Sequence, residues 1–259
     1  MGTVTKALSL LNYFSLTQPE IRLSDMARLS GMNKATVHRM LTELQAQGIV
    51  EQVGPDRAYR LGPGVLRLAA LREAAVPLMA VSREVLHVLS RETGETAHMS
   101  VLRGDRLSAL NHVYSPAHAT KVTMEDADEL AFHATGSGLA VLAFADTDFV
   151  ATILSAPLVA YTPHTITDPR NLRAKLDNIR TTGIAESISG FEEDVHSHAA
   201  PVFGPDRKPI GALGVAAPQS RVNGRSAALI RRHLAAAAQT LTARIGGFFP
   251  EDHPMERAA

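Results

Sequence analysis

The chain has 259 residues, of which 45% are hydrophobic and 5% aromatic, and it contains no cysteine and no tryptophan. This apolar content suffices for one large domain or two modest ones, and the lack of cysteine excludes disulfides, thiolate zinc sites and cysteine nucleophiles. No segment has the pattern of a signal peptide or the length of a membrane span, so we expect a cytoplasmic protein with no membrane partner.

The formal net charge of zero hides an uneven distribution along the chain. Residues 1–75 carry nine basic and six acidic side chains, which leaves 17 basic and 20 acidic side chains for residues 76–259. The formal charge of +3 on residues 1–75 and of −3 on residues 76–259 suggests a basic partner-binding module joined to an acidic domain.

Two short helices are predicted at the start of the chain. Apolar residues recur at helical spacing from Val4 to Phe14, and this stretch ends before Pro19. Ser24 is a candidate N-cap for a second short helix, which ends at Gly31. The glycine predicts a tight turn between this helix and the next one.

A third helix and a hairpin follow this turn. Asn33 is the candidate N-cap of a helix that runs to about Gln47 and is closed by Gly48. Residues 49–50 and 58–61 are predicted to form two short strands, joined by a turn at Gly54-Pro55-Asp56. Short helix, turn, longer helix and hairpin is the order of a winged helix-turn-helix domain.

The third helix has one face to bury and another to offer to a partner. At 100° per residue, Val37, Met40 and Leu41 lie on one stripe, and Arg39 lies at the centre of the opposite face. Arg39 is able to fork onto a guanine edge or to clasp a phosphate. The candidate DNA contacts are Ser24, Asn33, Lys34, Ala35, Thr36, His38, Arg39 and Thr42 on the helices, with Arg57, Tyr59 and Arg60 on the hairpin. A solvated amphipathic helix is the alternative, and the ordered set of elements favours DNA binding.

The rest of the chain predicts an α+β domain behind a linker helix. Residues 64–76 read as the linker helix and 78–93 as the first helix of the second domain, with Pro77 between them. Strands are expected near 96–103, 107–114, 195–203 and 209–216, and helices near 136–155, 169–182 and 226–245. The predicted boundaries are therefore 1–63, 64–77 and 78–259.

Several segments resemble the IclR (isocitrate lyase regulator) family of bacterial transcription factors. In the N-terminal part they are Lys6-Ala7-Leu8 through Leu11, Leu23–Ala27, Lys34–Leu41, Leu44, Gly48 and Tyr59–Gly62. In the C-terminal part they are His133–Ala140, in which Leu139 replaces the usual lysine, Ala199–Val202, Gly211–Leu213 and Ala217-Pro218. The resemblance covers nearly the whole chain in the right order.

The resemblance implies a ligand-responsive transcription factor without catalytic activity or cofactor. Its expected partners are a palindromic double-stranded operator, a small-molecule effector, and further copies of itself in dimers that often pair into tetramers. The C-terminal domain should be GAF-like with a ligand pocket, where the glycine-rich segment offers backbone N–H groups to a polar or anionic ligand. The positions that inherit effector contacts are Thr135, Gly136, Ser137, Gly138, Ser197, Gly214 and Ala216.

Two of these positions predict the type of effector. Relatives often place serines where this chain has Gly214 and Ala216. The loss of hydroxyl groups and the gain in apolar volume favour an aromatic acid, amide or hydrazide over small keto acids.

Three other functions were weighed. His196 and His198 point to one face of a strand, opposite Ser197, but no third metal ligand is identifiable nearby, so we expect no metal site. Ser137 and His133 suggest a nucleophile and base of a hydrolase, but no Gly-x-Ser-x-Gly elbow surrounds the serine, so we expect no catalytic residue. A purely structural oligomerisation domain is the third alternative, which a ligand-dependent melting shift would exclude.

Overall fold

The computed structural model describes residues 2–15, 17–75, 77–124 and 129–254. The chain divides into two compact units, Met1–Pro77 and Leu78–Ala259. Each unit is described by itself. Among the described residues, no helix combines the length and the apolar character needed to cross a bilayer.

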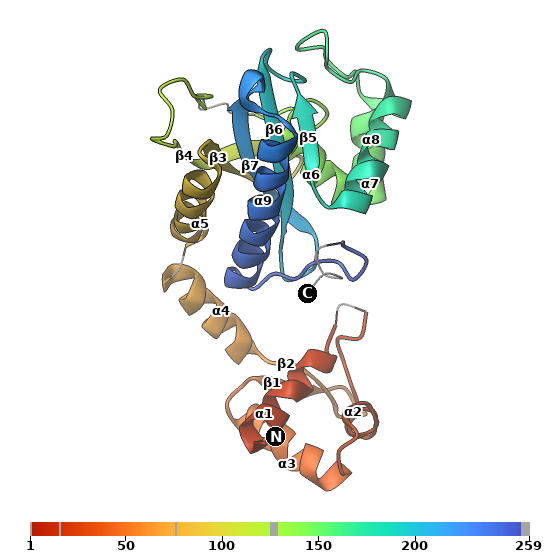
Figure 1. Cartoon of the computed structure of the whole chain (residues 1–259). Helices are drawn as coiled ribbons and strands as arrows, with labels where there is room; N and C mark the ends of the chain where they lie inside the picture. Colours follow the sequence, from red (N-terminus) through yellow and green to blue (C-terminus); the bar gives the residue numbers. More distant parts are fainter. Residues whose placement is uncertain (1, 16, 76, 125–128, 255–259) are drawn as a thin grey trace. The chain divides into compact units, whose positions relative to one another are not determined.

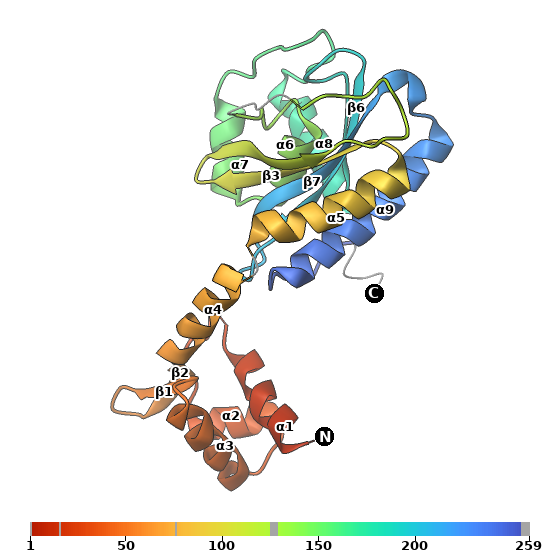
Figure 2. The same ribbon diagram turned by 90° about the vertical axis from the view of Figure 1, so that its left-hand side faces the viewer.

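The first unit consists of short helices and one hairpin (Figures 1 and 2). A core of buried side chains from Leu10 to Tyr59 holds its helices and hairpin together. The elements are α1 (Thr3–Ser9), the 3-10 helix η1 (Leu10–Tyr13), α2 (Leu23–Ser30), α3 (Lys34–Ala46), β1 (Val50–Val53), β2 (Ala58–Leu61) and α4 (Pro63–Ala75).

The ends of α2 and α3 test the capping predictions. The Asn33 side chain accepts a hydrogen bond of 2.8 Å from the backbone N–H of Ala35, which confirms it as the N-cap of α3. The prediction for Ser24 is wrong, because α2 begins at Leu23 and its N-cap is Arg22, which makes no side-chain capping bond. Gly31 has a left-handed φ of 66° and ends α2 as predicted.

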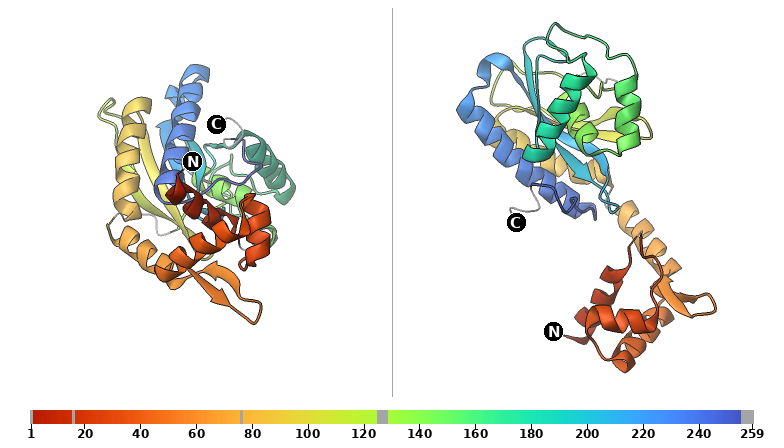
Figure 3. Two further views of the ribbon diagram at one scale, coloured as in Figure 1. Left: turned by 90° about the horizontal axis from the view of Figure 1, so that it is seen from below. Right: turned by 90° about the vertical axis from the view of Figure 1, so that its right-hand side faces the viewer.

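The hairpin projects from the helices of the first unit (Figure 3). β1 and β2 pair antiparallel with Val50 opposite Leu61 and Val53 opposite Ala58. A further backbone bridge joins Tyr59 of β2 to Ile21, with two N–H···O bonds of 2.8 Å. The hairpin is thus anchored to the segment that precedes α2.

The helix α4 is unusual in its exposed apolar side chains. Leu66, Leu68 and Leu71 are 74%, 48% and 58% exposed. Apolar residues lie all around this helix rather than on one stripe.

The second unit has one five-stranded antiparallel sheet, in the order β4-β3-β7-β6-β5 (Figure 1). Its strands are β3 (Thr96–Arg103), β4 (Arg106–Val113), β5 (Ala185–Ile188), β6 (Val195–Phe203) and β7 (Pro209–Pro218). Its helices are α5 (Leu78–Thr93), α6 (Gly136–Phe144), α7 (Thr147–Ser155), α8 (Pro169–Thr182), η2 (Gln219–Arg221) and α9 (Gly224–Arg244).

Helices cover both faces of this sheet. α5 and α9 lie side by side on one face (Figure 2), and α6 packs against β5, β6 and β7 on the other, with α8 behind it. Leu139 and Leu142 of α6 are buried in the core between these layers. This arrangement confirms the predicted α+β class with helices segregated around an antiparallel sheet.

One sequence prediction in the second unit is corrected, and one strand was missed. The helix expected over 136–155 is two helices, because the chain becomes extended at Ala145 and restarts after Asp146. The carboxylate of Asp146 binds Lys208 Nζ at 2.6 Å and makes no capping bond. The strand β5 was not predicted.

Candidate functional site

Two sites emerge, one in each unit, and the first is the outer face of α3. Val37, Met40 and Leu41 are buried, as the helical spacing predicts. The residues proposed to contact DNA on this helix are exposed, apart from half-buried Thr36: Lys34, Ala35, His38, Arg39 and Thr42.

The arginines of the first unit differ in their partners. Arg60 Nε donates to Glu51 Oε1 at 2.7 Å, and Arg57 donates to Gln52 Oε1 at 3.0 Å from its terminal nitrogen. Within the described part of the chain, no ion pair or hydrogen bond holds the guanidinium of Arg39. Among the described arginines proposed to contact DNA, Arg39 is therefore the one that needs to give up no partner to bind another molecule.

The prediction that Tyr59 of the hairpin contacts DNA is wrong, because its side chain is buried. Tyr59 is 1% exposed and belongs to the core of the first unit, so its side chain is not available to DNA. The sequence prediction failed because the Tyr59 side chain faces the core that Val37 and Leu41 of α3 share. Ser24 remains exposed in the first turn of α2.

The second site is a cavity of about 350 Å³ between the sheet and the start of α6. Residues directly opposite on neighbouring strands point to one face, and the register aligns Ser187, Ser197 and Ala216 across β5, β6 and β7. All three line the cavity. His196 and His198 point to the other face, as strand alternation predicts.

The N-terminus of α6 forms the polar end of the cavity. Thr135 caps the helix by accepting a bond of 3.0 Å from the Gly138 N–H. Gly136 and Ser137 line the cavity at the first helical positions, whose N–H groups lack intrahelical acceptors. A Cβ at Gly136 would lie 2.8 Å from Ser197 Oγ, so a larger residue here would force the Ser197 side chain to move.

His98 on β3 is a cavity residue that the sequence reasoning missed. Its Nε2 lies 3.2 Å from Ser137 Oγ. Burial, aided by the charge of nearby His112, lowers the pKa of His98 to about 4, so the ring is neutral at pH 7. Its Nδ1 has no hydrogen-bond partner in the described parts of the chain.

Two glycines do not have the effector-binding roles that the sequence suggested. A Cβ at Gly214 would lie 2.3 Å from His98 Nε2, so the imidazole fills the space over Gly214 and this glycine does not line the cavity. Gly138 is likewise not a lining residue, because it packs against the backbone of Ala131 and Phe132. Of the two positions expected to widen the cavity, Ala216 alone lines it.

Outside α6 and the aligned positions of the strands, the lining of the cavity is largely apolar. Its apolar lining comes mainly from the segments that precede α6 and follow β5. The lining residues there are Val122, Met124, Leu130, Phe191 and Val195, with Thr123, Gly190 and the exposed Glu192 beside them.

The geometry around Ser137 does not form the pair expected of a hydrolase. His133 Nε2 lies 2.9 Å from the carbonyl oxygen of Val159 instead. The histidine that does reach Ser137 is His98, and no described residue gives its Nδ1 the orienting partner that a catalytic base requires.

Both units match domain models of one protein family. Residues 72–243 match the family model described as bacterial transcriptional regulator IclR C-terminal, and residues 3–54 match the IclR helix-turn-helix domain. The transcriptional repressor IclR of Escherichia coli is 27% identical over 252 residues, which cover 95% of this chain and 90% of the relative.

Solved structures agree with this pattern. An IclR transcriptional regulator from Silicibacter sp. TM1040 is 58% identical, with a TM-score of 0.84 over 98% of this chain and 100% of that one. An IclR homologue from Microbacterium hydrocarbonoxydans, described as complexed with 4-hydroxybenzoate, is 24% identical and shares the fold. Its TM-score is 0.58 over 94% of this chain and 99% of that one.

Proposed function

The chain belongs to the IclR family of bacterial transcriptional regulators, and on that premise we propose how it binds its operator and which effector it senses. It is a DNA-binding regulator with a C-terminal effector domain, and its curated relatives are named regulators and repressors, not enzymes. We propose that a dimer binds a palindromic or near-palindromic operator, and that a small aromatic acid, or a related amide or hydrazide, occupies the cavity beside α6.

The proposal for the operator depends on the guanidinium of Arg39, which no described residue holds in a hydrogen bond or ion pair. Arg39 lies at the centre of the exposed face of α3, between exposed His38 and Thr42 and near the small Ala35. A small residue lets the helix approach base edges closely, and an arginine without a partner is able to bind guanine through two hydrogen bonds. Lys34, Arg57 and Arg60 are assigned to the phosphates, with Ser24 and Thr36.

Two variants test this assignment. Duplexes that bind the parent are selected from a random library, and affinities for selected and random duplexes are measured by anisotropy at several salt concentrations. Arg39→Ala should cost about 1–3 kcal/mol on selected duplexes and relax base preference. The control Arg57→Ala should weaken all duplexes similarly and reduce the salt slope by about one. An Arg39→Ala protein that discriminates as the parent does would show that α3 is not the reading helix.

Dimerisation is proposed from the exposed leucines of α4. Half-site recognition requires a two-fold partner, because one winged helix offers few phosphate contacts. Leu68 and Leu71, three residues apart on α4, form an apolar surface that a second copy of the chain would cover. The same proposal includes the pairing of two such dimers into a tetramer.

The proposal for the effector depends on a cavity that is polar at one end and apolar at the other. The α6 N-terminus carries a partial positive charge, which favours a carboxylate next to Gly136 and Ser137. Val122, Leu130 and Phe191 supply surfaces that suit a ring. The volume of about 350 Å³ is at the small end for ligand sites and matches a single-ring molecule. The 4-hydroxybenzoate named for one structural neighbour is a compound of this type.

Calorimetry with a ligand panel tests the proposed effector class. Benzoate, benzamide and benzohydrazide should bind more tightly than glyoxylate and pyruvate. Ala216→Phe fills the cavity and should abolish binding of the aromatic compounds, whereas Ser137→Ala should weaken the acid more than the amide. Tight binding of the keto acids, no response to aromatic compounds and indifference to Ala216→Phe would together exclude the aromatic class while leaving DNA binding intact.

A further inference from the structure

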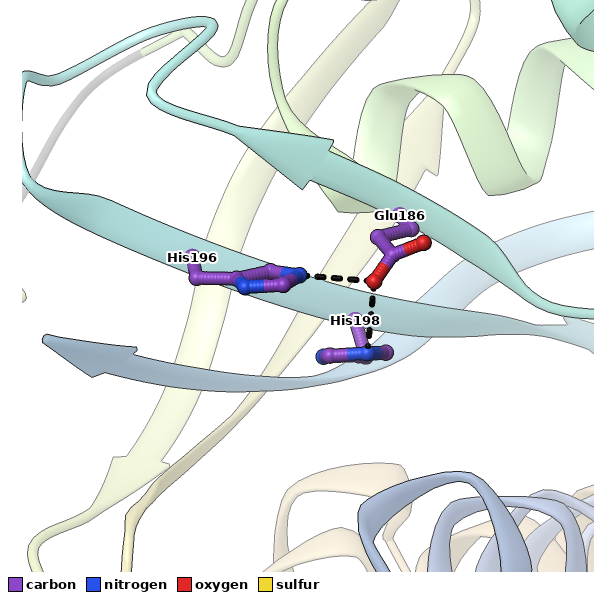
Figure 4. A group of neighbouring side chains, drawn as sticks. All are labelled: Glu186, His196 and His198. Carbon is purple, nitrogen blue, oxygen red and sulfur yellow. Dashed lines mark hydrogen bonds and ion pairs between the residues drawn. The ribbon is translucent and has the colours of Figure 1, made fainter. Parts of the chain in front are cut away.

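A second polar cluster lies on the face of the sheet opposite the cavity. Glu186 of β5 pairs in register with His198 of β6, and His196 lies two residues earlier on β6, so all three side chains point to the same face. Figure 4 shows both imidazoles directed at one carboxylate oxygen. Glu186 Oε1 is 2.7 Å from His196 Nε2 and 3.2 Å from His198 Nε2.

His198 is the most deeply buried residue of the three. The residue is 0% exposed. Its contact with Glu186 lacks hydrogen-bond geometry, and neither ring nitrogen has a hydrogen-bond partner among the residues that the structure describes. A buried polar group without a partner is costly, and a bound ion or water is the usual reason that such a group is retained.

We propose that Glu186, His196 and His198 form a binding site for a divalent transition-metal ion. The three donor atoms all lie within 4.8 Å of one another. Two imidazole nitrogens and one carboxylate oxygen, with water as a fourth ligand, form a donor set that binds zinc and ferrous iron rather than magnesium or calcium. A metal ion would give the buried ring of His198 the bond that no described residue supplies with hydrogen-bond geometry.

The protonation states in the cluster suit metal binding at neutral pH. Burial and the charge of His196 lower the pKa of His198 to about 4, so its nitrogen lone pair is free. Burial alone would raise the pKa of Glu186, but the hydrogen bond from His196 and the charge of Arg231 help to lower this pKa. The carboxylate is therefore ionised and the imidazole neutral, as metal ligands require.

Arg231 of α9 is the group that opposes a cation at this site. Its terminal nitrogen lies 3.4 Å from Glu186 Oε1, and its side chain is half exposed. Because it is exposed, Arg231 is able to turn toward solvent when a metal ion takes over the carboxylate. Metal and guanidinium thus compete for Glu186, and removal of the guanidinium should strengthen metal binding.

Metal titration of the tag-free, chelator-treated full chain tests the site. Zn²⁺ binding is measured by calorimetry, and Co²⁺ binding by the visible absorption of a four-coordinate ion. We expect one ion per chain. Glu186→Gln and His196→Gln should each weaken binding at least about 100-fold, since even partners outside the ligand shell contribute about 10- to 100-fold. The control His87→Gln, on the exposed face of α5, should not change the affinity.

A further variant separates loss of ligands from loss of folding. Arg231→Gln removes a half-exposed side chain and should bind the metal several-fold more tightly than the parent. Circular dichroism establishes that each variant is folded. The proposal is overturned if the parent does not bind the metal stoichiometrically, or if the parent and folded Glu186→Gln bind it with equal affinity. If the ligand variants do not fold, it is overturned by an Arg231→Gln protein that binds the metal no more tightly than the parent.

Discussion

Acid should destabilise the effector domain through His98. The unfolded ring titrates near 6.5, whereas burial lowers the folded pKa to about 4. The folded state therefore binds fewer protons between these values. The stabilisation from the neutral ring is complete above pH 6.5 and is lost as the pH falls toward 4. From the two pKa values, the loss is about 2 kcal/mol at pH 5 and about 3 kcal/mol below pH 4.

The contribution of His98 is measured as a difference between two proteins. Urea unfolding is followed by circular dichroism at pH 7.5 and pH 5.0, at one fixed protein concentration, for the parent and His98→Gln. The other buried histidines affect both proteins alike, so the parent should lose about 2 kcal/mol more than the variant between the two pH values. His87→Gln is the exposed control and should behave as the parent does. An equal loss in the parent and His98→Gln would refute the assignment of a neutral, desolvated ring at this position.

Three further predictions concern other parts of the chain. Asn33→Ala should destabilise α3 by about 1 kcal/mol, measured by hydrogen exchange, whereas Asn33→Asp keeps a capping oxygen and should cost little. Gly214→Ala should cost about 1–3 kcal/mol in urea unfolding, because its Cβ meets the His98 ring, and most of this cost should vanish in a His98→Ala background. In sedimentation the parent should be at least a dimer and Leu68→Asp should shift it toward monomer; a parent species of 27.7 kDa at micromolar concentration would contradict this.

Local patterns in the sequence predict most of the elements. The stop at Gly31, the cap at Asn33 and the hairpin turn each have a physical signal within a few residues, and the structure has all three. The strand β5 has only four residues, Ala185–Ile188, and no alternation long enough to distinguish it from a loop. Its position at the sheet edge depends on pairing with β6.

The site residues that were missed are those defined by pairing between distant strands. His98 reaches the cavity because β3 pairs with β7 and Gly214 leaves room for the ring, a match that neither strand shows alone. Glu186 joins His196 and His198 through the β5–β6 register, so two histidines could be recognised in the sequence but the third ligand could not. Ser197, in contrast, was placed correctly on the opposite face from the histidines by alternation alone.

The backbone bridge between Ile21 and Tyr59 has a mechanical consequence for regulation. It fastens the hairpin to the segment before α2, and the buried Tyr59 ring shares a core with Val37 and Leu41 of α3. We infer that the hairpin and α3 move as one rigid body, because the bridge and the shared core hold them together. The response to an effector should then appear as a changed tolerance for the number of base pairs between operator half-sites, with the preferred sequence of each half-site unchanged.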